Sequence, residues 1–173
     1  MAAPEVPIDV DPETGIWRTD GMPMIYLPRH FLVNLLKTME GEVGPARFRE
    51  LFYGSAVLSA RQWCAAEART HGLSPIETFH HYLRRMGQRG HGRFELTRLD
   101  RNARAAEVVA RNSAVALGYG PETGRKVCAI LEGSFAGGLA HVLEGEGIAG
   151  TAHCEEVACL AEGHPECRFA LTW

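Results

Sequence analysis

The sequence has no run of apolar residues near the roughly 20 that are needed to cross a bilayer. Its first residues, Met-Ala-Ala-Pro-Glu-Val-Pro, lack the basic start and the apolar core of a secretory signal peptide. We therefore expect a cytoplasmic location and no membrane span. The cysteines number five, which is odd, and in a reducing compartment this favours metal ligands or buried thiols over disulfides.

Clustered positive charge is also scarce. The 18 Lys and Arg residues are outnumbered by 21 Asp and Glu residues, which gives a formal net charge of −3. A nucleic-acid partner needs a concentrated basic surface, so we expect none. The one arginine-rich stretch, residues 84–93, is interrupted by Gly87, Gly90 and Gly92, and we interpret it as a turn between elements.

Several catalytic signatures are missing. The glycine-rich segment 133–138 lies inside an apolar helix pattern and lacks the lysine of a phosphate-binding loop. The sequence also contains no Gly-x-Ser-x-Gly elbow, no His-Glu-x-x-His pair and no dinucleotide-binding fingerprint. These absences favour a protein that is not catalytic on its own.

The length of 173 residues, with 46% hydrophobic and 23% charged residues, fits one soluble domain with a sizeable core. Three prolines within residues 1–14 indicate a flexible N-terminal arm, which leaves residues 15–173 as a single domain.

Hydrophobic periodicity and turn residues predict the order of the elements. Strands are expected at residues 16–17 and 22–27, helices at 28–39, 45–70 and 74–87, a hairpin at 93–99 and 106–111, a helix at 127–143, and a final strand pair at 148–158 and 168–173. Residues 74–77, Ser-Pro-Ile-Glu, form a capping box at the start of the third helix, and Gly41 and Gly44 are expected to end the first. This order predicts an α+β domain with antiparallel strands packed with helices.

The apolar helix at residues 127–143 carries an unusual number of small residues on its face, including Gly133, Gly137 and Gly138. Glycine in a helix interior costs up to about 1 kcal/mol relative to alanine. Their presence therefore predicts that a neighbouring element or a ligand approaches this helix closely.

The strongest chemical signal lies in the last twenty residues. Cys159 and Cys167 are separated by a turn at residues 163–165, and Glu156 precedes the first of them by three positions. With Cys128 upstream, three sulfurs and one oxygen make a tetrahedral Zn²⁺ site without an open position, which is the structural kind. Such a site would staple the C-terminal end of the domain.

Alternatives to this ligand set remain open. Cys154 is a rival to Cys128, and His153 or His164 would be an imidazole substitute for Glu156. The three thiols would also be compatible with simple burial without a metal.

Aromatic residues on the helices suggest a pocket for a small hydrophobic or aromatic molecule, with polar neighbours such as Ser55, Gln62 and His81 to orient it. The alternative is that the aromatic residues only pack on one another in the core. The candidate ligand-binding residues are Phe48, Phe52, Tyr53, Trp63, Phe79, Tyr82, Phe135 and Gly137.

Four segments of the sequence resemble a known family: residues 15–24, 44–54 and 86–99, and the pattern Cys128 … Glu156-x-x-Cys159-x7-Cys167. The chain is similar over nearly its whole length to the 4-vinyl reductase domain family, and to the related N-terminal sensor domain of aromatic-responsive transcriptional activators. The resemblance implies a mixed fold, a dimer, and zinc held by these four residues beside a buried pocket. The segment between Cys128 and Glu156 is longer here, which predicts an expanded loop at residues 145–150.

Three functions follow as hypotheses. The first is a zinc-stabilised binding module, a sensor or carrier that is not expected to switch transcription alone. The second is an accessory zinc-containing subunit of a larger catabolic oxidoreductase complex, and the third is a tetrapyrrole-handling protein of bacteriochlorophyll synthesis. A homodimer joined partly through the strand pair at residues 17–27 is expected in addition, because exposed strand edges pair readily with another chain.

Overall fold

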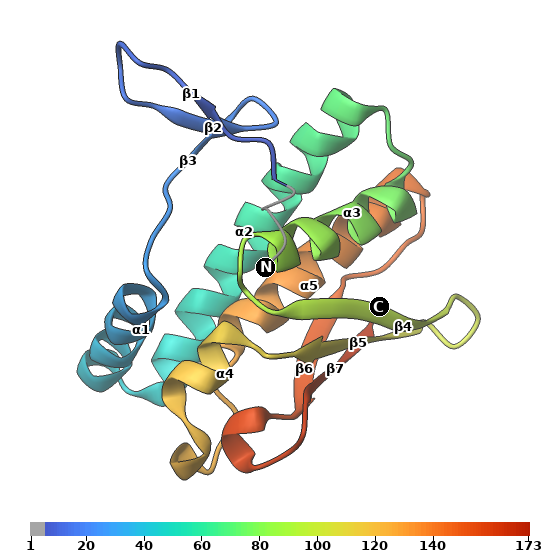
Figure 1. Ribbon diagram of the computed structural model, residues 1–173. Helices are drawn as coiled ribbons and strands as arrows, with labels where there is room; N and C mark the ends of the chain where they lie inside the picture. The colour runs from blue at the N-terminus through green and yellow to red at the C-terminus, as the bar shows by residue number, and fades with distance from the viewer. Residues whose placement is uncertain (1–5) are drawn as a thin grey trace.

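The computed structural model describes residues 6–173, so residues 1–5 of the expected arm lie outside the described residues. The division into an arm and a domain stays a prediction. Within residues 6–14, Asp9–Val10 forms strand β1, which pairs antiparallel with β2 (Trp17–Thr19). Strand β3 (Met22–Met24) completes a small sheet after a tight turn in which Asp20 and Gly21 both adopt positive φ. Figure 1 shows this sheet at the margin of the molecule.

Three helices follow. Helix α1 (Arg29–Val43) continues through Gly41 and ends at Gly44, which has a φ of 78°. The expected break at Gly41 is therefore wrong, because one glycine costs a helix only about 1 kcal/mol. Helix α2 (Pro45–His71) ends at Gly72 in the left-handed conformation, and α3 (Pro75–Gln88) begins with the predicted capping box of Ser74 and Glu77.

The main sheet has four antiparallel strands in the order β4-β5-β7-β6. Strands β4 (Arg93–Asp100) and β5 (Ala105–Arg111) form the predicted hairpin, and β6 (His153–Ala158) and β7 (Cys167–Thr172) form the predicted C-terminal pair. Strand β7 joins the two pairs because it also pairs with β5. The expected α+β class with antiparallel strands is confirmed.

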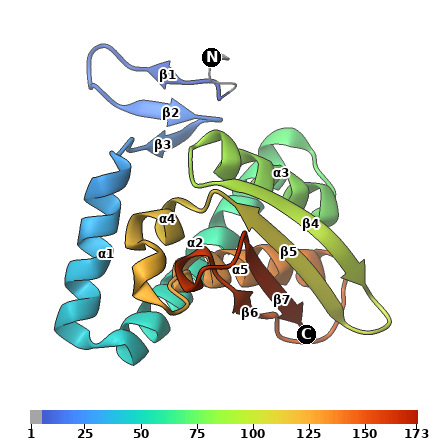
Figure 2. The ribbon, with the colours of Figure 1, turned by 60° about the horizontal axis from the view of Figure 1, so that its bottom comes forward.

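Helix α5 (Ala129–Gly145) is the centre of the fold. It packs along α2 on one side and against the sheet on the other, so most of its residues are buried (Figure 2). This arrangement explains why its sequence is apolar on nearly every face. None of the helices in the described part of the chain is both long and apolar enough to cross a membrane.

The glycines of α5 are explained by the neighbouring helices. A Cβ atom added at Gly133 would collide with the carbonyl oxygen of Tyr53, and one at Gly137 would lie 2.5 Å from the carbonyl oxygen of Val57. Gly138 gives the same room to the ring of Phe79. The close approach expected from the sequence is therefore made by α2 and α3.

One helix and two short turns were not expected from the sequence. Helix α4 (Ala114–Tyr119) begins at Ser113, whose hydroxyl accepts a hydrogen bond from the Ala116 amide. The 3-10 turns η1 (Pro121–Thr123) and η2 (Leu160–Glu162) lie side by side at the same end of the molecule. At three to six residues these elements are too short to show a periodic hydrophobic pattern.

Candidate metal centre and buried cavity

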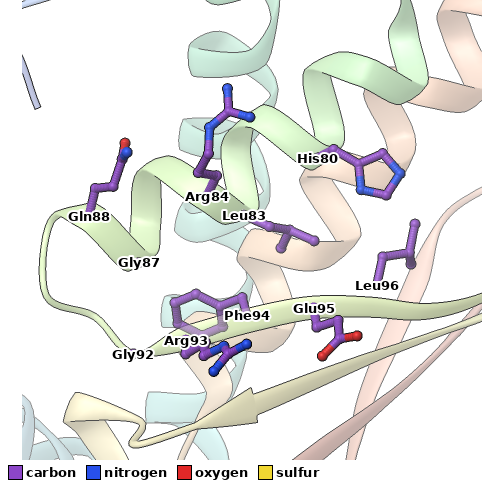
Figure 3. A pocket seen from close by; sticks show the side chains of 10 residues that line it. All are labelled: His80, Leu83, Arg84, Gly87, Gln88, Gly92, Arg93, Phe94, Glu95 and Leu96. Atoms are coloured by element: carbon purple, nitrogen blue, oxygen red, sulfur yellow. The ribbon is translucent and has the colours of Figure 1, made fainter. Parts of the chain in front are cut away.

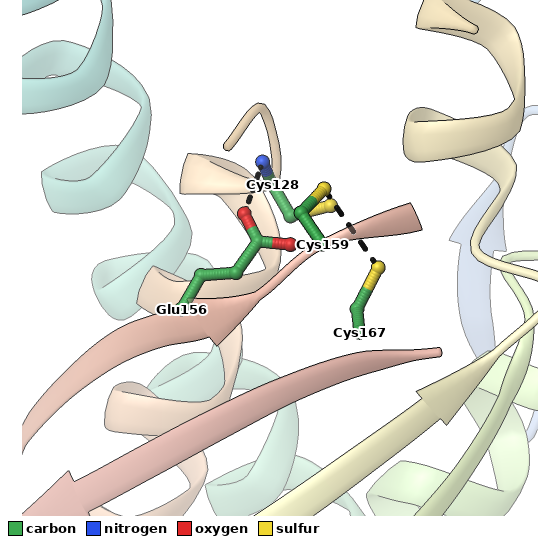
Figure 4. Close-up of side chains that lie close together, drawn as sticks. All are labelled: Cys128, Glu156, Cys159 and Cys167. Carbon is green, nitrogen blue, oxygen red and sulfur yellow. Dashed lines mark hydrogen bonds between the residues drawn. The ribbon is translucent and has the colours of Figure 1, made fainter. Parts of the chain in front are cut away.

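Three segments bring one carboxylate and three thiols together. Glu156 lies on β6, Cys159 follows that strand at η2, Cys167 begins β7, and Cys128 is the cap residue of α5 (Figure 4). One ligand atom from each of these residues lies within 4.8 Å of those from the other three, and each residue is buried. Cys154, His153 and His164 are outside this group of four.

The local chain explains the placement. Residues alternate along β6, so Cys154 and Glu156 point inward while His153 and Glu155 are exposed. The register of β6 against β7 then shifts between Glu156 and Ala158, as in a β-bulge. Such a shift turns the chain, which directs Cys159 to the same side as Glu156.

The sulfur geometry suits a shared cation. The Sγ atoms of Cys159 and Cys167 lie 3.9 Å apart, and all five cysteines are free. A disulfide would need about 2.05 Å between these atoms, whereas two sulfurs about 2.3 Å from a tetrahedral zinc ion lie about 3.8 Å from each other. The observed separation is too long for a disulfide and fits two ligands that could share one ion.

Backbone amides support both sulfurs. The Leu160 amide donates to Cys167 Sγ at 3.3 Å, and the Ala161 amide donates to Cys159 Sγ at 3.4 Å. Hydrogen bonds of this kind favour the thiolate, which is the form that binds a metal.

One carboxylate oxygen of Glu156 accepts a hydrogen bond, and the other has no partner among the described residues. The Cys128 amide donates to Glu156 Oε2 at 3.0 Å, while Glu156 Oε1 is buried without a hydrogen-bond partner among the described residues. The Glu156 amide donates in turn to Glu132 Oε1 at 2.6 Å, and Arg49 donates to that same oxygen. Because buried polar atoms are nearly always satisfied, Oε1 is a candidate metal ligand.

Four acidic groups in one buried space cannot all ionise without a cation. Burial, together with Cys159, raises the pKa of Glu156 to about 8. Hydrogen bonds with Cys159 and Cys167 raise the pKa of Cys128, and hydrogen bonds from Cys128 and Cys167 lower that of Cys159. Only part of the set therefore carries charge in the protein alone, and a divalent cation would allow the other groups to ionise.

A second cluster of possible ligands lies where the β2–β3 turn meets α2 and α3, and consists of Asp20, Glu67, His71 and His81. Arg84 approaches His81 Nδ1 at 2.7 Å, and an arginine only donates. His81 Nδ1 is therefore the acceptor, and its Nε2–H donates to Glu67 Oε2 at 2.8 Å. Since Asp20 is also paired with Arg85, this cluster is an ion-pair network that anchors the N-terminal turn.

A small cavity lies between the helices. We call it the central cavity; it has a volume of about 150 Å³, and α1, α2, α3, α4 and α5 all contribute to its wall. Its lining residues are Leu32, Ser59, Trp63, Tyr82, Met86, Arg89, His91, Val115, Ile130, Leu131 and Ser134. An outer cavity of about 250 Å³ shares Leu32, Arg89 and His91 with it and is otherwise lined by Leu27, Arg29, Gly90 and Ala114.

Of the eight candidate ligand-binding residues, Trp63 and Tyr82 line the central cavity. The rings of Phe48 and Phe52 instead pack on each other with centroids 4.4 Å apart. Tyr53 uses its hydroxyl to accept a hydrogen bond from the Cys154 amide.

The other three are occupied by contacts within the protein. Phe135 contacts Phe94 and Phe169 on the sheet side of α5, Phe79 packs against Gly138, and Gly137 faces α2. Of the expected polar neighbours, His81 is hydrogen-bonded to Glu67, whereas Ser55 and Gln62 are exposed.

The remaining lining residues were not among the eight candidates. Arg89 and His91 follow α3 in the glycine-interrupted stretch that was interpreted as a turn, and Val115 is on the unexpected helix α4. Ile130, Leu131 and Ser134 lie on α5, where nearly every residue is apolar or small, so the periodicity marks no single face.

A wider groove of about 550 Å³ runs between α3 and β4 (Figure 3). Arg84 and Arg93 line it together with Glu95, and β4 is an edge strand of the main sheet. Its open shape and mixed charge do not suit the enclosure of a small apolar ligand.

Comparison with solved structures shows what this fold is similar to. The phenol-responsive sensory domain of the transcription activator PoxR, solved with phenol, superposes with a TM-score of 0.79 and 21% identity, over 95% of this chain and 84% of that one. A vinyl-4-reductase family protein from Methanocaldococcus jannaschii gives a TM-score of 0.52 and 14% identity, over 86% and 83% of the two chains. The expected 4-vinyl reductase-like fold is confirmed.

A third structure shares the fold. Trafficking protein particle complex subunit 3 from Naegleria fowleri, covalently bound to palmitic acid, has a TM-score of 0.61 and 13% identity, over 83% of this chain and 93% of that one. A search of curated protein sequences finds no significant match. A family model, however, matches residues 2–97, more than half of the sequence, and the chain therefore belongs to the family described as domain of unknown function DUF5943.

Proposed function

We propose that this chain is a zinc-stabilised binding module for a small aromatic molecule, a sensor or carrier without catalysis of its own. The observation that carries the proposal is the central cavity, which is lined by residues of five helices and has apolar walls with a few polar groups. Ligand pockets typically have this composition. An apolar cavity of about 150 Å³ engineered in another protein binds benzene, so one aromatic ring is the right size.

Cys128, Glu156, Cys159 and Cys167 would hold the zinc ion. Four protein ligands leave no open position for a substrate or an activated water, so the ion would supply cohesion between α5, β6 and β7. This role agrees with the absence of a recognisable catalytic motif in the sequence.

The metal centre and the central cavity share parts of the chain. Cys128 caps α5, and Ile130 and Leu131 in the first turn of that helix line the cavity. Ser113 Oγ lies 3.7 Å from Cys128 Sγ, and Val115, two residues later, lines the cavity from α4. The ion would therefore fix two walls of the cavity without touching the ligand.

Filling the central cavity is expected to abolish ligand binding. The Ile130→Phe variant would place a ring where the ligand ring belongs, while Ile130 is only partly buried and so has room to adjust. Titration calorimetry with phenol should show saturable binding to the zinc-loaded protein and none to the variant.

Leu117→Phe is the matched control, because Leu117 is 49% exposed on α4 and lies outside the cavity. It should bind phenol like the unmodified protein. If neither phenol nor any other one-ring compound gives a saturable heat with zinc-loaded protein, the binding-module proposal is wrong.

A homodimer through the N-terminal segment is a further part of the proposal. The rings of Trp17 and Tyr26 contact each other at a tilt, with centroids 5.4 Å apart, and both residues are more than 40% exposed. Ile25 is 80% exposed. An apolar surface of this kind on a small edge sheet usually marks an interface. Light scattering should give twice the chain mass of 19.0 kDa.

The Ile25→Glu variant should shift the protein to the monomer, since a buried unpaired charge is costly at an interface. Val157→Glu, at an exposed position on β6, is the control that should leave the dimer intact. A single-chain mass for the unmodified protein at micromolar concentration would refute the dimer.

A further inference from the structure

We infer that the central cavity takes a one-ring aromatic anion, an arene carboxylate, held by Arg89 and Trp63. The inference rests on the proposed binding function and narrows its ligand class. Three features of the cavity support it: buried donors without acceptors, a lining charge of one sign, and a volume that fits one ring.

The first feature is a set of unused hydrogen-bond donors. Trp63 Nε1 and Arg89 Nε and Nη2 are buried and have no hydrogen-bond partner among the described residues. Buried donors are almost always satisfied, by protein, water or ligand. Nε and Nη2 form one edge of the guanidinium, and such an edge matches the two oxygens of a carboxylate.

The second feature is the sign of the charge. Arg89 lines both the central and the outer cavity, Arg29 lines the outer one, and the described lining of both contains no carboxylate. His91 also lines both, but burial lowers its pKa and favours the neutral imidazole, so the charge comes from the arginines. This is notable in a chain whose net charge is −3. A passage lined by one sign of charge raises the local concentration of the opposite ion.

Two carboxylates, those of Glu67 and Asp20, act on Arg89 through space, but neither accepts a hydrogen bond from its Nε or Nη2. Glu67 Oε2 accepts from His81 and Asp20 is paired with Arg85, while Glu67 Oε1 is buried without a hydrogen-bond partner among the described residues. The guanidinium of Arg89 instead lies over the ring of Trp63, 5.2 Å from its centroid. The arginine is therefore held in place by a cation–π contact with its carboxylate-binding edge unused.

The third feature is size and polarity. At about 150 Å³ the central cavity accepts one ring. Leu32, Met86, Val115 and Leu131 supply apolar walls for that ring, while the donors gather at Trp63 and Arg89. A ligand with an apolar ring and a single anionic group complements this distribution.

The test is a matched pair of ligands on zinc-loaded protein. Benzoate and benzamide have nearly the same shape, but only benzoate carries a charge. Titration calorimetry is expected to show benzoate binding at least about tenfold more tightly, the lower limit for hydrogen bonds to a charged group. In Arg89→Met, which keeps an apolar stem over Trp63, benzoate affinity should fall about tenfold to hundredfold while benzamide affinity stays.

Arg98→Met is the charge-matched control. Arg98 is exposed on β4 away from both cavities, so the variant should keep the preference for benzoate. Trp63→Phe, which removes one donor and keeps a ring, should weaken benzoate more than benzamide and provides a second variant if Arg89→Met does not fold.

The outcomes separate the two proposals. If benzamide or phenol binds as tightly as benzoate, the anion inference is overturned and the binding-module proposal stands. If Arg89→Met binds benzoate as the unmodified protein does, Arg89 is not the anion ligand and the inference also fails. If no one-ring compound binds zinc-loaded protein, the binding-module proposal fails and this inference with it.

Discussion

Replacing Cys159 by serine is expected to release the metal ion and to lower the thermal midpoint by about 6–20 °C. A serine hydroxyl does not ionise, so the site would lose the thiolate that lies 3.9 Å from Cys167 Sγ. The remaining acidic groups would then be buried without a cation. Breaking a buried charged contact costs about 3–5 kcal/mol, and each kcal/mol is worth about 2–4 °C in a domain of this size. Elemental analysis and scanning calorimetry would measure the two effects.

Cys154→Ser is the matched control for this prediction. Cys154 is also buried on β6, two positions before Glu156, but it is outside the group of four ligand residues. The variant should keep one zinc ion per chain and lose only the smaller cost of burying a hydroxyl, about 1–3 kcal/mol. A Cys159→Ser protein that retains its zinc and its midpoint would rule out the proposed centre.

Metal release is also expected to weaken ligand binding. An ion bound to Cys128 would fix the start of α5, so its removal would leave the cavity wall formed by Ile130 and Leu131 free to move. Apo-protein prepared by chelation should bind phenol more weakly than zinc-loaded protein, and added zinc should restore the affinity. Equal affinity in both forms would show that the two sites are independent.

That Cys128, Glu156, Cys159 and Cys167 lie together was predictable from the sequence because most of their spacing is local. Strand alternation directs Glu156 inward, and a short turn joins Cys159 to Cys167. Only Cys128 lies far from the other three in the sequence. The helix ends were predictable for the same reason, since the capping box of Ser74 and Glu77 acts within one turn.

The cavity was predicted only in its rough location. The long helix, the helix after it and the glycine-rich helix do contribute to its wall, but most of its lining residues depend on how five helices cross. Aromatic residues at helical spacing, such as Phe48 and Phe52, instead pack on each other and do not line the cavity. Arg89 has no periodic pattern around it, and only the lack of hydrogen-bond partners for its Nε and Nη2 among the described residues reveals it.

The pairing of β7 with β5 was also not predictable from the sequence. These strands are separated in sequence by α4, α5 and β6, so no local turn sets their register. Local hydrophobic alternation identifies a strand and its buried face, but it does not identify which partner the strand will find.

The glycines of α5 provide a second large effect, because they set how closely it approaches α2. A Cβ atom at Gly137 would lie 2.5 Å from the Val57 carbonyl oxygen and 2.8 Å from the Ala60 Cβ. Both are parts of a helix backbone or fixed directly to it, so neither can swing aside. The two helices would have to separate along their length, and the core between them would loosen.

Gly137→Ala is therefore expected to destabilise the protein by about 1–3 kcal/mol, the usual cost of overpacking a core. Gly54→Ala is the matched comparison, because Gly54 lies within the facing helix α2 and a Cβ there would meet nothing within 4 Å. It should stabilise the protein by up to about 1 kcal/mol through helix propensity alone. Urea unfolding of both variants would measure the opposite signs. If both substitutions stabilised the protein, α5 would have room for a side chain at Gly137, and the close contact with α2 would no longer explain why glycine is there.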